Sequence, residues 1–233
     1  MTEEKIDRRR HYILMLDTET ANTQTDEDGR LDMSSVLVYD LGYQVIDKHG
    51  NVYKKASFVN SDIFIQEREL MQSAYYAHKL PQYSEDIRNG KRTLTTFYNI
   101  KNDVHNTIKQ YDIDTVCAHN SRFDYNALNT TQRWETKSKY RYFLPYGIEI
   151  WDTLKMSRDV IGKMPTYRRF CEENGYLTKN GQLRFTAEIL YRFISKDENF
   201  IEAHTGLEDV EIETKILAYC FRQHKAMRKK LWD

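Results

Sequence analysis

The order of hydrophobic and polar positions predicts three strands in the first quarter of the chain. Residues 12–16, YILML, form a short continuous apolar run of the kind found in buried strands. Residues 34–47 alternate between apolar and polar positions and lead into the turn signal KHGN, after which residues 52–59 return as a third strand. We therefore expect an antiparallel meander.

The spacing of apolar residues becomes helical after residue 63. Phe97, Ile100, Val104 and Ile108 recur at steps of three and four within residues 95–111, which indicates an amphipathic helix. Further helices are expected at 63–87, 123–134, within 173–194 and at 207–230, a strand at 115–120, and a strand that runs into a helix at 148–161. A meander followed by alternating helices and strands predicts an α/β fold with helices packed on a mixed sheet.

Length and composition indicate one compact unit. The 233 residues suffice for one sizeable core, and the chain lacks repeats, low-complexity tracts and Pro/Gly-rich linkers. We expect a single domain over residues 1–233, with a short N-terminal extension at 1–10 and a basic helix end at 222–233. The 35 basic and 35 acidic residues balance, so any binding to a polyanion must come from local patches or bound cations.

The cysteines and the apolar runs suggest where the protein works. Three widely spaced cysteines fit reduced thiols better than a disulfide framework. No run approaches the roughly 20 apolar residues that a membrane span needs, and the N-terminus lacks the apolar region of a signal peptide. We expect a cytoplasmic protein without a membrane partner.

Two acidic residues, Asp17 and Glu19, follow the first predicted strand. Side chains two positions apart on a strand point to the same face. Two carboxylates that close repel each other unless one is protonated or a cation lies between them, and Mg²⁺ or Mn²⁺ would suit their oxygen ligands. The alternative is a strand end at the surface with both carboxylates solvated.

More acidic residues occur at the ends of later elements. Asp124 follows the second short strand, beside Asn120 and Phe123, and His204 precedes Asp209 by five residues at the start of the last helix. Five helical residues span about 140°, so a histidine that shares a site with Asp209 must lie on the preceding loop, from which it can reach a bound water. Each residue alone also has a structural explanation, as a helix cap, a loop histidine or a charge at a helix N-terminus.

In combination and order these residues resemble the three motifs of the DEDDh 3′-to-5′ exonucleases, a family that includes the epsilon proofreading subunit, RNase T and oligoribonuclease. The resemblance runs from residue 12 to about residue 220 and comprises DxE at Asp17 and Glu19, HNxxFD from His119 to Asp124, and HxxxxD from His204 to Asp209. The pair Asp152 and Thr153 matches a DT-containing strand end that the family often has, with a structural role. Asn22 stands where many members have glycine, and Val210 where alanine is common.

The resemblance implies a ribonuclease H-like fold with a central mixed five-stranded sheet and helices on both faces. It also implies two divalent ions, Mg²⁺ or Mn²⁺, which stabilise the attacking and leaving oxygens of a phosphodiester. By resemblance, Asp17, Glu19, Asp124 and Asp209 are the metal ligands and His204 is the general base. Residues expected to bind the substrate are Thr18, Thr20, Asn120 and Phe123.

The implied activity is removal of nucleoside 5′-monophosphates from single-stranded 3′ ends, with DNA slightly favoured over RNA. One alternative is RNA trimming of the RNase T or oligoribonuclease kind, and another is a non-catalytic nucleic-acid-binding scaffold. Partners could include a DNA polymerase or another replication protein. Residues 133–143, RWETKSKYRYF, interleave cations with aromatic rings, which suits single-stranded nucleic acid or an ordinary solvated edge with its aromatics packed inward.

Overall fold

The computed structural model describes residues 6–22, 24, 25, 28, 29, 31–72, 74 and 77–232, so half of the predicted N-terminal extension, residues 1–5, lies outside the described residues. Its described residues form one six-stranded sheet with the order β4-β3-β2-β1-β5-β6. The strands are β1 (Ile13–Ala21), β2 (Leu37–Ile46), β3 (Val52–Asn60), β4 (Thr93–Thr95), β5 (Thr115–Ala118) and β6 (Glu149–Asp152).

The sheet is mixed, as predicted, but has one strand more than the five expected. Strands β1, β2 and β3 form the antiparallel meander, β5 pairs parallel to β1, and β6 pairs parallel to β5. The additional strand, β4, pairs parallel to β3. With three residues and two threonines around Leu94, β4 is too short to show an alternating pattern in the sequence.

Nine α-helices lie in the described ranges, and none combines the length and hydrophobicity needed to cross a bilayer. The region 63–87, predicted as helical, is divided into short helices and a 3₁₀ turn at Ala77–Lys79. The helices are α1 (Ser61–Phe64), α2 (Arg68–Gln72), α3 (Leu80–Arg88), α4 (Phe97–Tyr111), α5 (Arg122–Thr136), α6 (Thr153–Val160), α7 (Pro165–Glu173), α8 (Ala187–Ser195) and α9 (Gly206–Arg222).

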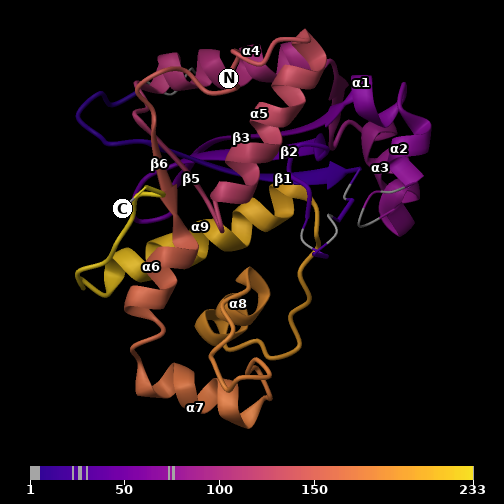
Figure 1. The fold of residues 1–233 in the computed structure, drawn as a ribbon. Coiled ribbons are helices and arrows are strands. Elements are labelled where there is room, and N and C mark those ends of the chain that lie inside the picture. The colour runs from indigo at the N-terminus through magenta and orange to yellow at the C-terminus, as the bar shows by residue number, and fades with distance from the viewer. Residues whose placement is uncertain are drawn as a thin grey trace.

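The alternation of β1 side chains assigns one set of helices to each face of the sheet. Leu14 and Leu16 pack in one core cluster with buried residues of α4 and α5. Ile13 and Met15 pack in another with residues of α6, α7, α8 and α9. Helices therefore cover both faces, as predicted, and Figure 1 shows α4 and α5 on one side of the sheet with α9 on the other.

The C-terminal segment is not the helix end that the sequence predicted. Helix α9 ends at Arg222, and His224 has a left-handed backbone with a φ of 51°. The chain then runs along β6, where Asp152 N donates to Lys229 O at 2.8 Å and Leu231 N donates to Ile150 O at 2.8 Å. An edge strand presents unpaired backbone groups, so pairing with β6 and burial of Leu231 stabilise this extended segment over a longer helix.

Candidate active site

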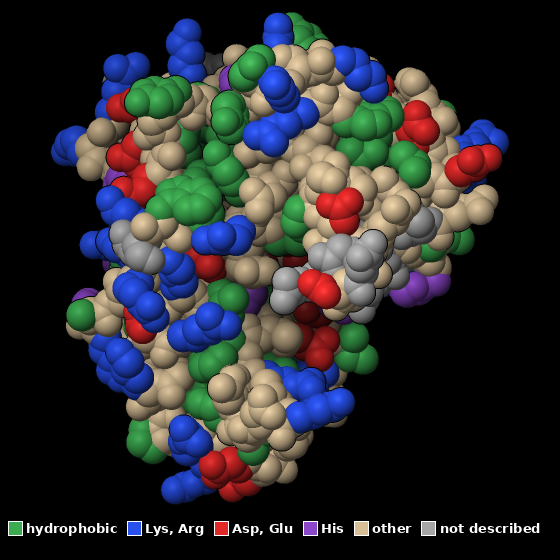
Figure 2. Space-filling view, in the orientation of Figure 1, with side chains coloured by type: hydrophobic (Ala, Val, Ile, Leu, Met, Phe, Trp, Pro, Cys, Tyr) green, Lys and Arg blue, Asp and Glu red, His purple; other side chains and the backbone are tan. Residues whose placement is uncertain are grey.

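A cleft of about 1080 Å³ opens at the carboxyl ends of β1 and β5. Its walls also include the start of α5, residues 182–187 and the loop that precedes α9. Figure 2 shows acidic side chains recessed in a hollow near the centre of the molecule. All nine predicted site residues line this cleft: Asp17, Thr18, Glu19, Thr20, Asn120, Phe123, Asp124, His204 and Asp209.

Asp17, Glu19 and Asp209 form a close group of carboxylates. Asp17 and Glu19 continue the odd-numbered face of β1, on which α9 packs, and Asp209 lies in the first turn of α9. Each of the three offers an oxygen within 4.8 Å of the others. Such an arrangement suits a hard divalent cation, which prefers carboxylate oxygens.

A glycine contact allows α9 to approach the sheet this closely. Gly42 pairs with Asp17 across β1 and β2, and a Cβ on Gly42 would overlap the backbone of Gly206 and Leu207 at the start of α9. A Cβ on Gly206 would lie 2.6 Å from Gly42 N. Because only glycine leaves this space empty at both positions, the Gly42–Gly206 contact sets the distance between Asp209 and Asp17.

Asp124 reaches the cleft from the first turn of α5 and is held by β1. The Thr18 backbone N–H and hydroxyl both donate to Asp124 Oδ1, at 3.1 and 2.8 Å. The Thr18 side chain thus fixes the fourth acid of the predicted set, in addition to lining the cleft.

At the end of β1, Asn22 has a φ of 59°, so it adopts the left-handed turn conformation that asparagine tolerates better than most residues.

His204 lies on the loop before α9, as its spacing from Asp209 required. The Asp209 carboxylate accepts from His204 N at 3.2 Å and from Thr205 N at 2.9 Å, which accounts for the left-handed φ of 50° at His204. The imidazole Nδ1 is 3.8 Å from a Glu202 carboxylate oxygen. Together with Glu188, these two residues form a second group whose potential ligand atoms lie within 4.8 Å of one another.

Glu213 is a cleft residue that the sequence analysis missed. It is buried, lines the cleft and accepts a hydrogen bond from His119 N at 3.2 Å. Its position four residues after Asp209, about one helical turn, was the signal that could have identified it.

Asp152, by contrast, has the expected structural role: it caps α6 through Leu154 N and accepts from Asn120 N.

A buried ion-pair network fixes the entry to α9 from the other side. The Arg92 guanidinium contacts Asp40, Asp86 and Glu208, with its Glu208 contact at 2.8 Å. Asp40 also accepts from Gly206 N at 2.9 Å. The start of α9 is therefore bonded to β2 and to the segment after α3, which limits how far Asp209 can move from Asp17.

Burial and mutual repulsion raise the pKa of the clustered acids. Burial, and then the charges of Glu213, Asp124 and Asp209, raise the pKa of Asp17 well above its ordinary value. Burial is also the first cause at Glu19, whose pKa rises to about 9, at Asp209, where it rises to about 8, and at Asp124, where it rises to about 7. A bound divalent cation would offset both effects, because its positive charge stabilises the ionised carboxylates.

These pKa values predict how stability depends on pH. Acids with a raised folded pKa stabilise the fold fully below their unfolded pKa of about 4 and lose that contribution as pH rises through the folded values. The melting temperature in EDTA is therefore expected to fall between pH 6 and pH 9. Millimolar Mg²⁺ or Mn²⁺ should reduce this fall, because a cation at 100 times its Kd adds about 2.7 kcal/mol. Thermal melts with K⁺ at matched ionic strength are the control, and parallel curves with and without the divalent ion would contradict the prediction.

Among the comparisons with known proteins, the solved structures identify the fold. No protein-family model matches the sequence, and no curated protein is a significant match. The nuclease domain of 3′hExo, a DEDDh family member bound to rAMP, aligns with a TM-score of 0.62 at 14% identity and covers 94% of this chain and 96% of that one.

Two further solved structures extend this comparison. A full-length 3′-exonuclease aligns with a TM-score of 0.61 at 14% identity, over 94% of this chain and 85% of that one. Exonuclease I from Methylocaldum szegediense aligns with a TM-score of 0.55 at 14% identity, over 92% of this chain but 41% of its own. With the sheet order and helix layers described above, these alignments show that the chain has the ribonuclease H-like fold of the DEDDh-type 3′-exonucleases.

Proposed function

We propose that the protein is a metal-dependent 3′-to-5′ exonuclease that hydrolyses phosphodiester bonds in nucleic acid. The observation that carries this proposal is the group of carboxylates from Asp17, Glu19 and Asp209, whose oxygens lie within 4.8 Å in an open cleft. A cluster of this kind is unfavourable without a cation. The fold shared with DEDDh exonucleases supports the same activity.

The donor set of the cleft fits divalent metal ions. Asp17, Glu19 and Asp209 would hold one ion, and Asp17 and Asp124 would hold a second, because hard cations take carboxylate and water oxygens. Such ions would supply charge stabilisation for the attacking and leaving oxygens of an in-line displacement. Thr18 holds Asp124 in place, and the Arg92 network holds the start of α9.

His204 would take the proton of the attacking water. Burial, followed by the charge of Lys79, lowers the pKa of His204 below its ordinary value, so the imidazole is neutral at neutral pH and able to accept a proton. Its backbone is fixed by the Asp209 carboxylate, which couples the position of the base to that of a metal ligand.

Replacing His204 tests this role. His204→Ala is expected to lower kcat by about 10²–10⁴-fold, the usual contribution of a positioned general base. The rise in melting temperature on adding Mn²⁺ should persist, because the three clustered carboxylates remain. His49→Ala, in the β2–β3 turn, is the matched control for loss of an imidazole. Unchanged turnover in His204→Ala would exclude the histidine from the base role.

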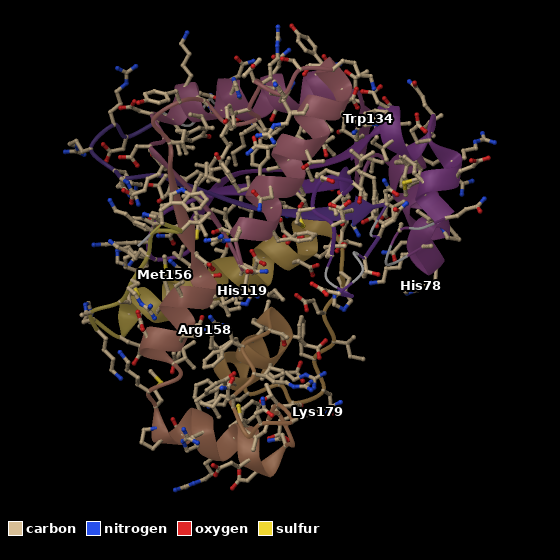
Figure 3. The ribbon with its side chains drawn as sticks, in the orientation of Figure 1. His78, His119, Trp134, Met156, Arg158 and Lys179 are labelled. Carbon is tan, nitrogen blue, oxygen red and sulfur yellow. The ribbon has the colours of Figure 1, made fainter. Side chains whose placement is uncertain are left out.

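Cations in the cleft wall suit a nucleic-acid substrate. Arg158 of α6 and Arg184 both line the cleft. Figure 3 labels Arg158 and His119 on the α6 side, and Lys179 on the segment between α7 and α8. The positive charges of Arg158 and Arg184 line the same cleft as the acidic group, where the phosphates next to the scissile bond would pass.

The substrate is proposed to be single-stranded, with DNA or RNA to be decided by assay. One similar structure, E. coli Exonuclease I at a TM-score of 0.52, is in complex with a 5cy-dT13 oligonucleotide, whereas 3′hExo is bound to rAMP. The test is digestion of matched 5′-labelled DNA and RNA strands with Mg²⁺ or Mn²⁺, comparing the wild type with Asp17→Asn. A ladder of shortened labelled strands from the wild type alone supports the exonuclease. Equal, negligible cleavage by both proteins would favour a binding scaffold.

A further inference from the structure

The loop after α5 presents tyrosines to solvent on a firmly anchored backbone. Phe143 is buried against Phe97, and its backbone N–H donates to Asn129 Oδ1 at 2.9 Å. Around it, Tyr140, Tyr142 and Tyr146 are 80%, 53% and 106% exposed. We define the aromatic–basic surface as the exposed cations and tyrosines of the last turn of α5 and the loop that follows it: Arg133, Lys137, Lys139, Tyr140, Arg141, Tyr142 and Tyr146.

Most cations of this surface lack an acidic partner. Within the described part of the chain, Arg133, Lys139 and Arg141 form no ion pair with a carboxylate, and Lys137 has a charge interaction with the partly buried Glu135. Two of them lie over rings of the same surface, with the Arg133 guanidinium 5.4 Å from the Tyr142 ring centre and the Lys139 ammonium 5.2 Å from that of Tyr140. In a chain with equal numbers of acidic and basic residues, this is a local excess of positive charge.

We propose that the aromatic–basic surface binds the part of a single-stranded nucleic acid that lies 5′ to the end held in the cleft, an inference that rests on the proposed function. Exposed rings offer stacking faces to bases, and unpaired cations offer contacts to phosphates, the combination that non-specific single-strand binding requires. The inward-packed alternative accounts for Phe143 but not for the three exposed tyrosines.

Helix α5 sets the distance between this surface and the cleft. Asp124 lies in its first turn and Arg133 in its last, and 15 residues at 1.5 Å each make the helix about 22 Å long. Figure 3 shows Trp134 at the end of α5 remote from His119, and Figure 2 shows basic and hydrophobic side chains together along the upper edge of the molecule. At about 3.4 Å per stacked nucleotide, a strand needs roughly six nucleotides to reach from the cleft to the surface.

The test compares long and short strands. Fluorescence anisotropy in EDTA measures binding of labelled 16-mer and 4-mer oligonucleotides to the wild type, Lys139→Glu/Arg141→Glu and Tyr140→Ala/Tyr142→Ala. Each double variant is expected to bind the 16-mer about tenfold or more weakly and the 4-mer within about twofold of the wild type. The charge variant should also reduce the slope of log affinity against log salt by about 1.4, which corresponds to two lost phosphate contacts.

The control is Lys48→Glu/Lys109→Glu, which makes the same charge change at exposed sites outside the surface. Wild-type 16-mer affinity in both surface variants, or an equal loss in the control, would overturn the inference. Cleavage of the 4-mer with Mn²⁺ separates the two proposals. If the wild type cleaves the 4-mer but the surface variants bind the 16-mer as tightly as the wild type does, the proposed function stands and only the inference about this surface fails. A wild type that cleaves neither strand refutes the function itself.

Discussion

Asp17→Asn is expected to lower exonuclease turnover by about 10³-fold while raising the melting temperature of the metal-free protein. The two effects have one cause. Burial, and then the charges of the neighbouring acids Glu213, Asp124, Asp209 and Glu19, raise the pKa of Asp17 well above the ordinary value. A neutral amide of the same shape removes this repulsion, but it also removes the ligand that would contact both ions, and a loss of about 4 kcal/mol of charge stabilisation corresponds to about 10³-fold in rate.

The measurements are single-turnover digestion of a labelled strand and thermal melts in EDTA at pH 8, within the pH range where charge on the wild-type cluster is expected to destabilise the fold. The rise in melting temperature on adding Mn²⁺ should shrink in the variant, because one ligand is lost. Asp112→Asn, an exposed position at the end of α4 with a φ of 54° that asparagine tolerates, is the matched control. A variant that loses activity and also becomes less stable without metal would show that Asp17 has a structural role instead.

The site residues were taken from the resemblance to the exonuclease motifs, but local periodicity predicted two features of their geometry. The two-residue repeat of β1 placed Asp17 and Glu19 on one face, and the five-residue interval to Asp209 placed His204 on a loop. Those two inferences need no knowledge of the rest of the chain. The alternation of strands and helices likewise predicted a mixed sheet with helices packed on it, and the family resemblance implied that helices cover both faces.

The remaining features depend on contacts between distant parts of the chain. The extended C-terminal segment pairs with β6 about 80 residues earlier in the sequence, and β4 exists because β3 offers it a partner. In the sequence, Glu213 is one of several acidic residues in a predicted helix, and its place in the cleft follows only from the packing of α9 against His119. Gly42 is the strongest example, since nothing in a strand sequence shows that a helix backbone 164 residues later will lie against it.

Gly42→Ala should therefore lower the free energy of unfolding, whereas an ordinary glycine-to-alanine replacement in a strand is favoured by backbone entropy. The added Cβ would overlap the backbone of Gly206 and Leu207, which cannot rotate away as a side chain does. We expect a loss of about 3 kcal/mol in the free energy of unfolding, or a fall of roughly 6–12 °C in melting temperature for a chain of this size.

The same variant tests whether the spacing of α9 from β1 controls catalysis. Displacement of α9 moves Asp209 and the His204 loop away from Asp17, and a shift of about 1 Å in a catalytic group can lower turnover about 10²-fold. Melts, with digestion assays at a temperature where the variant is folded, separate the two effects, and Val52→Ala, at an exposed position of neighbouring β3, is the control for a strand substitution. Wild-type stability in Gly42→Ala would mean that α9 does not approach β2 through these glycines. Reduced stability with wild-type turnover would mean that the contact supports the fold without setting the geometry of the acids, because α9 can then retreat from the sheet while Asp209 still reaches Asp17.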